Sequence, residues 1–446
     1  MKLSSVLAYG ILLPGILAGA AAVQAAPPVT VAHHTNPADP QMWVTMDARE
    51  LDTLRAGMSR KELARMPRTL EVYDGVAMAV TTESGLEDLA IAVHGKLDRC
   101  AGFVAHTSPE EAEQFLYAPI TAPRILAVDY SIDRQTEVRA TLAQVAPANV
   151  AATIRTLSNY PTRYYQNQTG QDAAVWLQQR WTQIAAGRTD VRVERFNHAA
   201  WLQDSVIATI TGTQFPTEVI VLGGHLDSIR SRGGSSAQCT TTCTAASCPA
   251  ACRAPGADDD ASGIASLTET YRAMIAAGFR PARTIKFMAY AAEEVGLRGS
   301  QEIARTMIGQ GVNVVGVLQY DMTNFKNGAA NAVDVGILAD RNFTNPTQNA
   351  FLRRLLTTYL PELTVNATTT CGYGCSDHAS WSAQGVPASI AFEARFGQQS
   401  PNAHSAADTF TRPNTDTTGA IAAKFSRLGA AYLIELGKGA ITPRTR

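Results

Sequence analysis

Residues 218–224 read EVIVLGG, an apolar run with the length and composition of a buried strand. Similar runs lie at 284–290 (TIKFMAY), 314–320 (VVGVLQY) and 388–394 (ASIAFEA). Between the first two runs, apolar residues recur at helical spacing on one face, and this pattern ends at Gly278. Strands that alternate with helices in this way predict an α/β fold with a mostly parallel sheet.

Side chains that can bind metals follow these apolar runs. After the first run come His225 and Asp227, after the second Glu293 and Glu294, and after the third Asp321. The carboxyl ends of parallel strands meet at one edge of a sheet, where open α/β sheets bind their ligands. We therefore expect these side chains to converge in one crevice.

Two further stretches add potential ligands. APGADDDASGIA (254–265) places Asp258, Asp259 and Asp260 in a row before the helix, and SPNAHSAADT contains His404. Imidazoles and carboxylates without a nearby thiolate suit zinc in a hydrolytic site. Five or six such ligands exceed the four of one tetrahedral ion, but they suit two ions roughly 3.5–4 Å apart that share a carboxylate and a water. Two cations would also balance the charge of the aspartate run.

Taken singly, these features have ordinary structural explanations. Aspartates before a helix cap it and favour its dipole, Glu293 and Glu294 could be a solvated charge pair, and His404 could be a loop residue. The pair His225 and Asp227 is more specific, because a nearby carboxylate can orient a ligating imidazole. The collection of these groups at strand ends favours the metal site.

The composition limits the partners and the compartment. Charged residues make up 17 % of the chain and the formal net charge is −1, without a basic run, which argues against nucleic acid or an anionic membrane as a partner. Residues 1–25 are typical of a secretory signal, with Lys2, an apolar stretch at 6–17 and small residues at 23–25. An N-terminal membrane anchor is the alternative, but the stretch is short and Pro14 interrupts it. We expect a secreted protein, extracellular or periplasmic.

The cysteines fit an oxidising compartment. Four of the seven lie in a loop rich in Ser, Thr and Ala, at Cys239, Cys243, Cys248 and Cys252. They suggest two disulfides whose pairing the sequence leaves open; a zinc knuckle is the alternative, although its usual two-residue gaps are missing. Cys371 and Cys375 flank GYG and suggest a small ring, and Cys100 lies on an apolar helical stripe and is expected to be a buried free thiol.

Residues 26–136 are predicted to form a separate α+β unit. They contain a strand-like VAMAVTT (76–82), a helical stripe and a second strand-like run, RILAVDYSI (124–132), followed by the polar segment 133–144, which is expected to be a linker. A helix at 147–159 then opens the longer region 137–446. In an exported hydrolase, such an N-terminal unit is most simply a pro-segment that assists folding or covers the site until it is cleaved.

Six stretches together resemble the di-zinc aminopeptidase family, of the secreted bacterial leucyl type, over about residues 137–440. They are GGHLDS, APGADDDASGIA, AAEEVGLRGS, LQYDMTN, TCGYGCSDHASW and NAHSAADT. The resemblance implies a single catalytic domain with a mixed, mostly parallel sheet flanked by helices, and two zinc ions at the strand ends.

By position, the resemblance assigns His225 and Asp321 to one zinc ion and Glu294 and His404 to the other, with Asp259 bridging both. It also implies a cis peptide bond between Asp259 and Asp260, and it makes Asp227 the residue that orients His225.

The resemblance further implies how the reaction proceeds. A water between the zinc ions attacks the first peptide carbonyl, Glu293 is the general base, and Tyr373 donates a hydrogen bond to the developing oxyanion. The substrate's free α-amine lies against the second zinc ion, so a free N-terminus is required. The family's disulfide corresponds to Cys371–Cys375.

Four positions match the lining of the family's apolar pocket for the first side chain and favour Leu-like residues: Met322, Ile390, Phe392 and Phe396. Two lining positions depart from the family, because Gln399 replaces an aromatic residue and Ala403 replaces a larger aliphatic one. The insertion 239–252 is expected to overhang the rim of the cleft and to restrict longer peptides.

The sequence thus predicts a monomeric, secreted, two-zinc exopeptidase that removes hydrophobic N-terminal residues. A glutaminyl cyclase-like transferase would use one zinc ion and would not need all five ligands. A carboxypeptidase would need basic residues near the cleft, for which the candidates are Arg395 and the neighbours of the insertion. A non-catalytic binding protein on this fold should have lost ligands, and none is missing here.

Overall fold

The computed structural model describes residues 39–97, 102–117, 128–236, 239, 243–340, 342–411 and 415–442. These belong to one compact unit, residues 36–446. The expected signal segment and Cys100 lie outside the described residues. Within the described part of the chain, no helix has the length and apolar character needed to cross a membrane.

A mixed sheet of eight strands forms the centre of the region after residue 137, which the resemblance makes the catalytic part, in the order β12-β11-β13-β10-β7-β9-β6-β5. The strands are β5 (Val191–Phe196), β6 (Ser205–Ile210), β7 (Phe215–His225), β9 (Arg283–Tyr290), β10 (Asn313–Tyr320), β11 (Val335–Leu338), β12 (Val365–Thr369) and β13 (Ala388–Phe392). The four runs predicted as strands became β7, β9, β10 and β13, which lie side by side and are mutually parallel. The predicted α/β fold with a mixed, mostly parallel sheet is confirmed.

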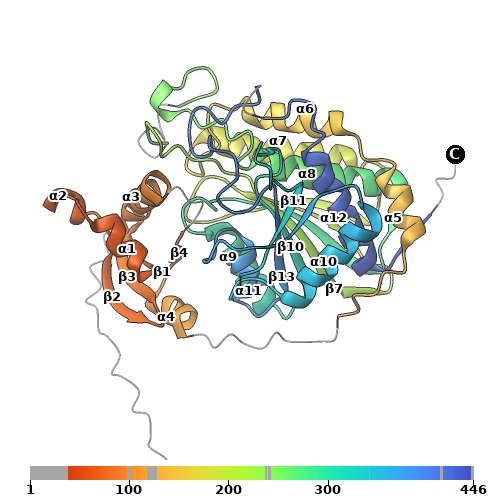
Figure 1. Ribbon diagram of the computed structural model, residues 1–446, viewed down its shortest axis with the longest axis horizontal. Coiled ribbons are helices and arrows are strands. Elements are labelled where there is room, and N and C mark those ends of the chain that lie inside the picture. The colour runs from red at the N-terminus through yellow and green to blue at the C-terminus, as the bar shows by residue number, and fades with distance from the viewer. Residues whose placement is uncertain are drawn as a thin grey trace, which may run out of the picture. The chain divides into compact units, whose positions relative to one another are not determined.

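Helices cover both faces of this sheet (Figure 1). They are α5 (Gln135–Leu142), α6 (Pro147–Ser158), α7 (Gln168–Ile184), α8 (Ala261–Ala277), α9 (Arg298–Gly309), α10 (Pro346–Tyr359), α11 (His378–Ser382) and α12 (Ala422–Gly437). Successive residues of β7 point to opposite faces: Ile220 and Leu222 pack in the core under α8 and α12, whereas Val219 and Val221 pack with residues of α9 and α11. Burial on both faces explains why this strand reads as a continuous apolar run.

The segment 133–144, expected to be a linker, instead forms α5 and packs against α12. Its buried residues are Val138 and Thr141, and the backbone N–H groups of Asp133 and Arg134 donate to the carboxylate of Glu435. A helix that buries one narrow stripe can be polar elsewhere, which hid it in the sequence.

The strand predicted at 124–132 is also wrong for the part that the structure describes. Residues 128–132 join no strand; Val128, Tyr130 and Ile132 instead lie partly buried on the main core. Their alternation produced a strand-like pattern because every second side chain faces that core.

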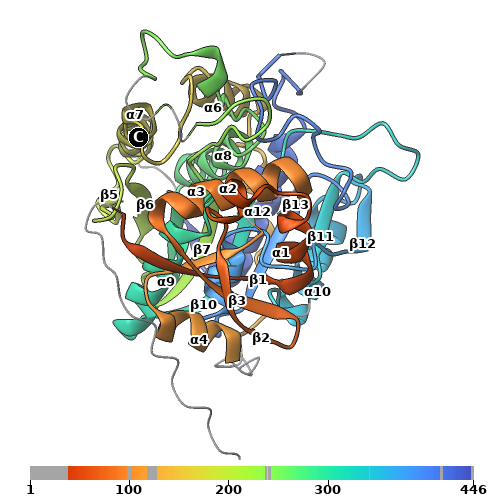
Figure 2. The same cartoon turned by 90° about the vertical axis from the view of Figure 1, so that its left-hand side faces the viewer.

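The N-terminal unit has its own antiparallel sheet, in the order β2-β3-β1-β4 (Figure 2). Its elements are β1 (Gln41–Asp47), α1 (Ala48–Arg55), α2 (Arg60–Leu63), β2 (Arg68–Tyr73), β3 (Val76–Thr82), α3 (Glu83–Ala92), the π-helix η1 (Val93–Leu97), β4 (Val104–His106) and α4 (Pro109–Tyr117). Its core continues into the catalytic part, where Tyr164, Tyr165, Ala292 and Val295 join the same apolar cluster. Short elements elsewhere are η3 (Ala250–Cys252), β8 (Phe279–Arg280) and β14 (Ala440–Ile441).

Candidate metal centre

Five side chains from separate parts of the sequence meet at the carboxyl ends of the parallel strands. His225 ends β7, Asp321 follows β10, Glu294 follows β9, Asp259 precedes α8 and His404 lies in the loop after β13. All five are buried. The structure therefore brings together every residue that the sequence analysis proposed as a metal ligand.

The carboxylate of Asp259 stands between the two histidines. Its Oδ1 lies 3.0 Å from Nε2 of His225, and its Oδ2 lies 2.9 Å from Nε2 of His404. On the first side, Nε2 of His225 is 3.8 Å from Oδ1 of Asp321. On the second side, Nε2 of His404 is 3.5 Å from Oε2 of Glu294. One carboxylate thus joins two imidazole–carboxylate groups.

The polar atoms of this cluster fit a divalent cation. The Nε2 atoms of His225 and His404 face the carboxylate oxygens given above without the geometry of a hydrogen bond. Both carboxylate oxygens of Glu294 and Oδ1 of Asp321 are likewise buried without a hydrogen-bond partner among the described residues. Burying such groups without compensation is costly. Ligand atoms of one tetrahedral zinc ion, each about 2.0–2.2 Å from the metal, lie roughly 3.3–3.6 Å apart, close to the His404–Glu294 separation. Imidazole and carboxylate donors are also those that zinc accepts in hydrolytic sites.

The electrostatics of the cluster point the same way. Burial disfavours the charged imidazole of His225, but the facing carboxylates of Glu293 and Asp227 outweigh burial and raise its pKa well above the usual value. Burial, reinforced by the carboxylate of Asp259, raises the pKa of Glu294 well above its usual range. Both pKa shifts arise because several carboxylates are buried close together, and bound cations would neutralise their negative charge.

Asp227 and Asp260 hold the loops of the histidine–carboxylate cluster in place. The carboxylate of Asp227 lies 3.5 Å from Nδ1 of His225 and accepts hydrogen bonds from the backbone N–H groups of Glu293 (3.0 Å) and Glu294 (3.2 Å). The carboxylate of Asp260 caps α8 through the N–H of Gly263 (2.8 Å). It also accepts from the N–H of His225 (3.0 Å) and that of Met322 (3.2 Å). The peptide bond between Asp259 and Asp260 is cis.

Two residues with a supporting position were missed by the sequence analysis. Asp408 accepts hydrogen bonds from the backbone N–H groups of Asp258 and Asp259, both at 3.0 Å. Its place four residues after His404 was the available signal. The buried guanidinium of Arg163 donates to carbonyl oxygens on both sides of the site, at Leu226 (2.8 Å) and Gly256 (2.9 Å). Nothing in the sequence around Arg163 marked it.

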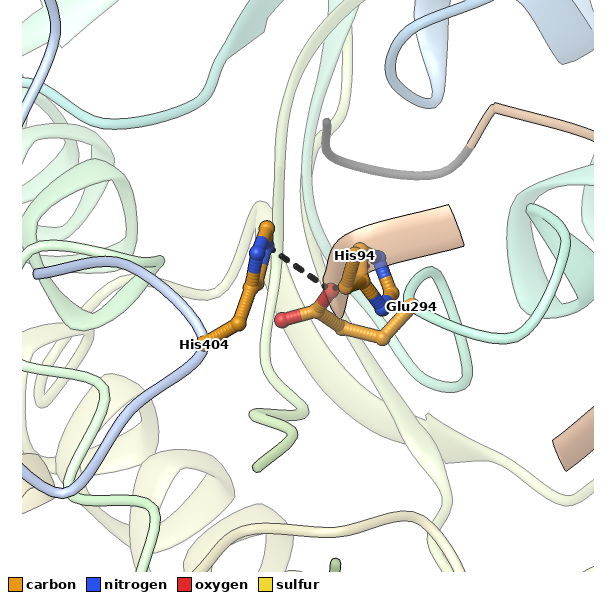
Figure 3. A group of neighbouring side chains, drawn as sticks. All are labelled: His94, Glu294 and His404. Atoms are coloured by element: carbon orange, nitrogen blue, oxygen red, sulfur yellow. Dashed lines mark ion pairs between the residues drawn. The ribbon is translucent and has the colours of Figure 1, made fainter. Parts of the chain in front are cut away.

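A third missed residue is His94, from η1 of the N-terminal unit. Its Nε2 lies 3.3 Å from Oε2 of Glu294, and its ring lies 4.1 Å from the ring of His404 (Figure 3). A single histidine far upstream of the five proposed ligands carries no recognisable spacing in the sequence.

The residues proposed to line the substrate pocket also meet in one cluster. Met322, Ile390, Phe392 and Phe396 pack together with Tyr373, Ala403 and the Cys371–Cys375 disulfide. The rings of Tyr373 and Phe396 are 6.1 Å apart, edge to face. Gln399 turns to its own loop, where its side-chain oxygen accepts from the N–H of Gly397 (2.6 Å).

The insertion 239–252 carries two disulfides, Cys239–Cys252 and Cys243–Cys248. This pairing, which the sequence left open, replaces the zinc-knuckle alternative. The chain just before the insertion contacts the loop that carries His404: the N–H groups of Ser231 (3.1 Å) and Arg232 (3.2 Å) donate to the carbonyl oxygen of His404. The insertion is therefore attached next to the metal centre.

A buried histidine–carboxylate cluster at the strand ends of a mixed α/β sheet is the arrangement of a zinc-dependent metallohydrolase. Comparison with known proteins narrows this class: the sequence profile of peptidase family M28 matches residues 205–428, and the chain belongs to this family. It is a zinc-dependent aminopeptidase, a hydrolase that acts on peptides.

Relatives in sequence and structure agree with this assignment. Leucine aminopeptidase 1 of Coccidioides posadasii is 34 % identical over 289 residues, which cover 62 % of this chain and 69 % of the relative. Leucine aminopeptidase 1 of Ajellomyces dermatitidis is 33 % identical over 309 residues, covering 67 % and 74 %. These relatives are fungal, whereas the sequence motifs suggested the bacterial type. Among solved structures, the LapA aminopeptidase of Legionella pneumophila matches with 26 % identity and a TM-score of 0.71, over 89 % of this chain and 98 % of that one.

Proposed function

We propose that this protein is a secreted, monomeric exopeptidase that uses two zinc ions to remove a Leu-like residue from the free N-terminus of peptides. The observation that carries the proposal is the carboxylate of Asp259, whose two oxygens face different histidines at 3.0 and 2.9 Å. A carboxylate in this position can bridge two ions.

In this proposal each zinc ion has its own histidine and its own carboxylate. His225 and Asp321 would hold one ion, Glu294 and His404 would hold the other, and Asp259 would bind both. Asp227, Asp260 and Asp408 would keep these ligands in place through the backbone hydrogen bonds described above. A glutaminyl cyclase-like enzyme with one ion would not need the complete set.

The chemistry divides between the metal and the chain. Bound zinc supplies a Lewis acid that activates water and polarises the scissile carbonyl. Glu293 would accept the proton of the attacking water and deliver it to the leaving amine. Its carboxylate is buried next to the cluster, and burial raises its pKa well above the usual range, which favours a group that must both accept and return a proton. The hydroxyl of Tyr373 would donate a hydrogen bond to the developing oxyanion.

Specificity would come from the apolar cluster of Met322, Ile390, Phe392 and Phe396. Its aromatic and aliphatic walls suit a hydrophobic first side chain, and the names of the fungal relatives support leucine. The small Ala403 belongs to the same cluster and would leave room for side chains larger than leucine.

Three disulfides support an oxidising compartment, as the proposed signal at residues 1–25 requires. Residues 26–136 would then act as a pro-segment before the catalytic domain, residues 137–446. The apolar cluster shared by the N-terminal unit and the turn after β9 supports a role in covering the site.

A panel of aminoacyl chromogenic substrates, with free and with blocked N-termini, tests the proposal. We expect cleavage of free leucyl and related hydrophobic substrates, no cleavage of the blocked ones, and loss of activity with a chelator. Cleavage of the blocked substrates would show that the enzyme does not require a free N-terminal amine and would contradict the proposal. Metal analysis should find two zinc ions per chain, and one ion would contradict the bridging role of Asp259.

A further inference from the structure

His94 belongs to the N-terminal unit, yet its imidazole lies in the metal centre. It stands on η1, directly after α3, and its Nε2 is 3.3 Å from Oε2 of Glu294 (Figure 3). His94, Glu294 and His404 each offer a ligand atom, and these three atoms lie within 4.8 Å of one another. The His94–Glu294 distance equals the roughly 3.3 Å expected between two ligands of one tetrahedral zinc ion.

Hydrogen bonding does not account for this position of His94. Both of its ring nitrogens are buried and lack a hydrogen-bond partner among the described residues, and the same holds for both oxygens of Glu294. Buried polar atoms are nearly always satisfied by a donor, an acceptor, a water or an ion. Here, unsatisfied nitrogens and oxygens from two parts of the chain face one another, as metal ligands do.

Contacts on both sides of His94 keep it in place. Before it, Glu83 of α3 pairs with Arg298 (2.6 Å), and Glu87 accepts from the hydroxyl of Tyr164 (2.8 Å). After it, the N–H of Ala105 in β4 donates to the carbonyl of Gly296 (3.1 Å). Gly296 lies on the same turn as Glu294, and Arg298 begins α9 just after this turn, so the N-terminal unit contacts the segment that carries Glu294 on both sides.

We infer that His94 is a zinc ligand of the uncleaved chain, bound to the ion that Glu294 and His404 hold. This inference rests on the proposed two-zinc site. An imidazole and a peptide's α-amine are both neutral nitrogen donors, so His94 would compete with the substrate's amine for this ion. The N-terminal unit therefore strengthens metal binding and at the same time keeps the enzyme inactive. A unit that only blocked access to the site would keep the enzyme inactive without strengthening metal binding.

Metal binding by the full, uncleaved chain tests the inference. The variants are His94→Ala and His94→Phe; the phenyl ring fills the space but cannot bind zinc. We expect both variants to lose one zinc ion to a competing chelator about tenfold or more readily than the wild type. With Co2+ in place of zinc, both should show an altered visible absorption spectrum.

His106→Ala is the matched control. His106 is another buried histidine of the N-terminal unit, and its Nε2 is hydrogen-bonded to the hydroxyl of Thr45 (2.9 Å) in β1. This variant should keep the zinc affinity and the cobalt spectrum of the wild type. Circular dichroism shows whether each variant is folded.

Enzyme activity is the second measurement, and it should change in the opposite direction to zinc affinity. Uncleaved His94→Ala should hydrolyse a leucyl substrate faster than the uncleaved wild type, although it holds metal less tightly. Free imidazole added to this variant should restore the cobalt spectrum of the wild type and slow hydrolysis again.

The possible results separate this inference from the proposed function. Unchanged zinc affinity and cobalt spectra in both His94 variants would overturn the inference, even if the rate rose, because His94 would then only obstruct the cleft. An equal change in His106→Ala would overturn it as well. If substitution of His94 changes the cobalt spectrum but no form of the chain cleaves aminoacyl substrates, the role of His94 as a ligand stands and the proposed function fails.

Discussion

The three adjacent aspartates show how contacts give identical residues different tasks. Asp258 accepts a hydrogen bond from the N–H of Asn324 (3.0 Å), and Asp260 accepts from three backbone N–H groups. Of these three aspartates, only the middle one, Asp259, has its carboxylate within 3.0 Å of both His225 and His404. Because the outer two carboxylates bind the backbone, the middle one is held in a fixed direction toward the metal centre.

The first prediction concerns the adjacent glutamates. Glu293→Gln removes the proton acceptor but keeps the shape of the side chain, so we expect kcat to fall by about 10²–10⁴-fold while two zinc ions remain bound. Glu294→Gln is the matched variant at the next position, and it should lose metal. Enzyme kinetics and metal analysis of both proteins check the assignment. If Glu293→Gln lost zinc and Glu294→Gln retained it, the two roles would be reversed.

A second prediction concerns Asp408, which accepts from two N–H groups of the aspartate loop. In Asp408→Asn, the amide NH2 would face one of these donors and leave it unsatisfied, at a cost of about 1–3 kcal/mol. We also expect zinc affinity to fall by about 10–100-fold, because the loop that carries Asp259 loses support. Thermal unfolding and chelator competition measure the two effects. Wild-type zinc affinity in a destabilised variant would show that Asp408 serves the fold alone.

At the scale of elements, α3 connects the N-terminal unit to the catalytic part through a titratable contact. The pKa of Glu87 is raised to about 6. Burial is the main cause and the nearby carboxylate of Glu83 adds to it, whereas the hydrogen bond from Tyr164 acts in the opposite direction. The other groups that face Glu87 are Tyr165 and Asp88. The folded state therefore binds a proton here more tightly than the unfolded chain does. The stabilisation is complete below about pH 4.5 and is lost as the pH rises through about 6.

The third prediction follows from this contact. Glu87→Gln removes the titration but keeps an oxygen for the Tyr164 hydroxyl. The wild type should lose on the order of 1 kcal/mol more stability than the variant between pH 4 and pH 8, once solvent screening of this partly exposed group is considered. Thermal unfolding across this range is the measurement. Glu83→Gln, which breaks an ion pair with Arg298, should instead be less stable than the wild type throughout the neutral range. Parallel pH profiles of wild type and Glu87→Gln would contradict the prediction.

The elements also show what the sequence could predict. β7, β9, β10 and β13 were predictable because both faces of each strand are buried, and α8 because Gly278 ends its apolar stripe in a left-handed conformation. The meeting of the proposed ligands His225, Glu294 and Asp321 was predictable because each stands at the end of one of these strands or just after it. α5 was missed because only a narrow stripe of it is buried. His94, Arg163 and Asp408 act through contacts between distant segments, and such contacts leave no periodic pattern in the sequence.

For the molecule as a whole, the candidate metal centre brings together five separate parts of the chain at one edge of the sheet. Buried carboxylates that lose their cations repel one another, so removal of zinc should destabilise the entire chain. A ligand present at about 1,000 times its Kd contributes about 4 kcal/mol to stability. We therefore predict that a chelator lowers Tm by several degrees, that added zinc restores it, and that the far-ultraviolet circular dichroism at 25 °C changes little. An unchanged Tm would show that the cluster does not bind metal in the folded protein.

The buried guanidinium of Arg163 has a consequence for the order in which the enzyme matures. It ties the segment after His225 to the one before the aspartates by hydrogen bonds to carbonyl oxygens, so contacts of the chain itself connect these two loops. We expect the polypeptide to reach its final shape first and to acquire its ions as a late, separate event. An apoprotein prepared under native conditions should then accept other divalent ions in exchange without refolding.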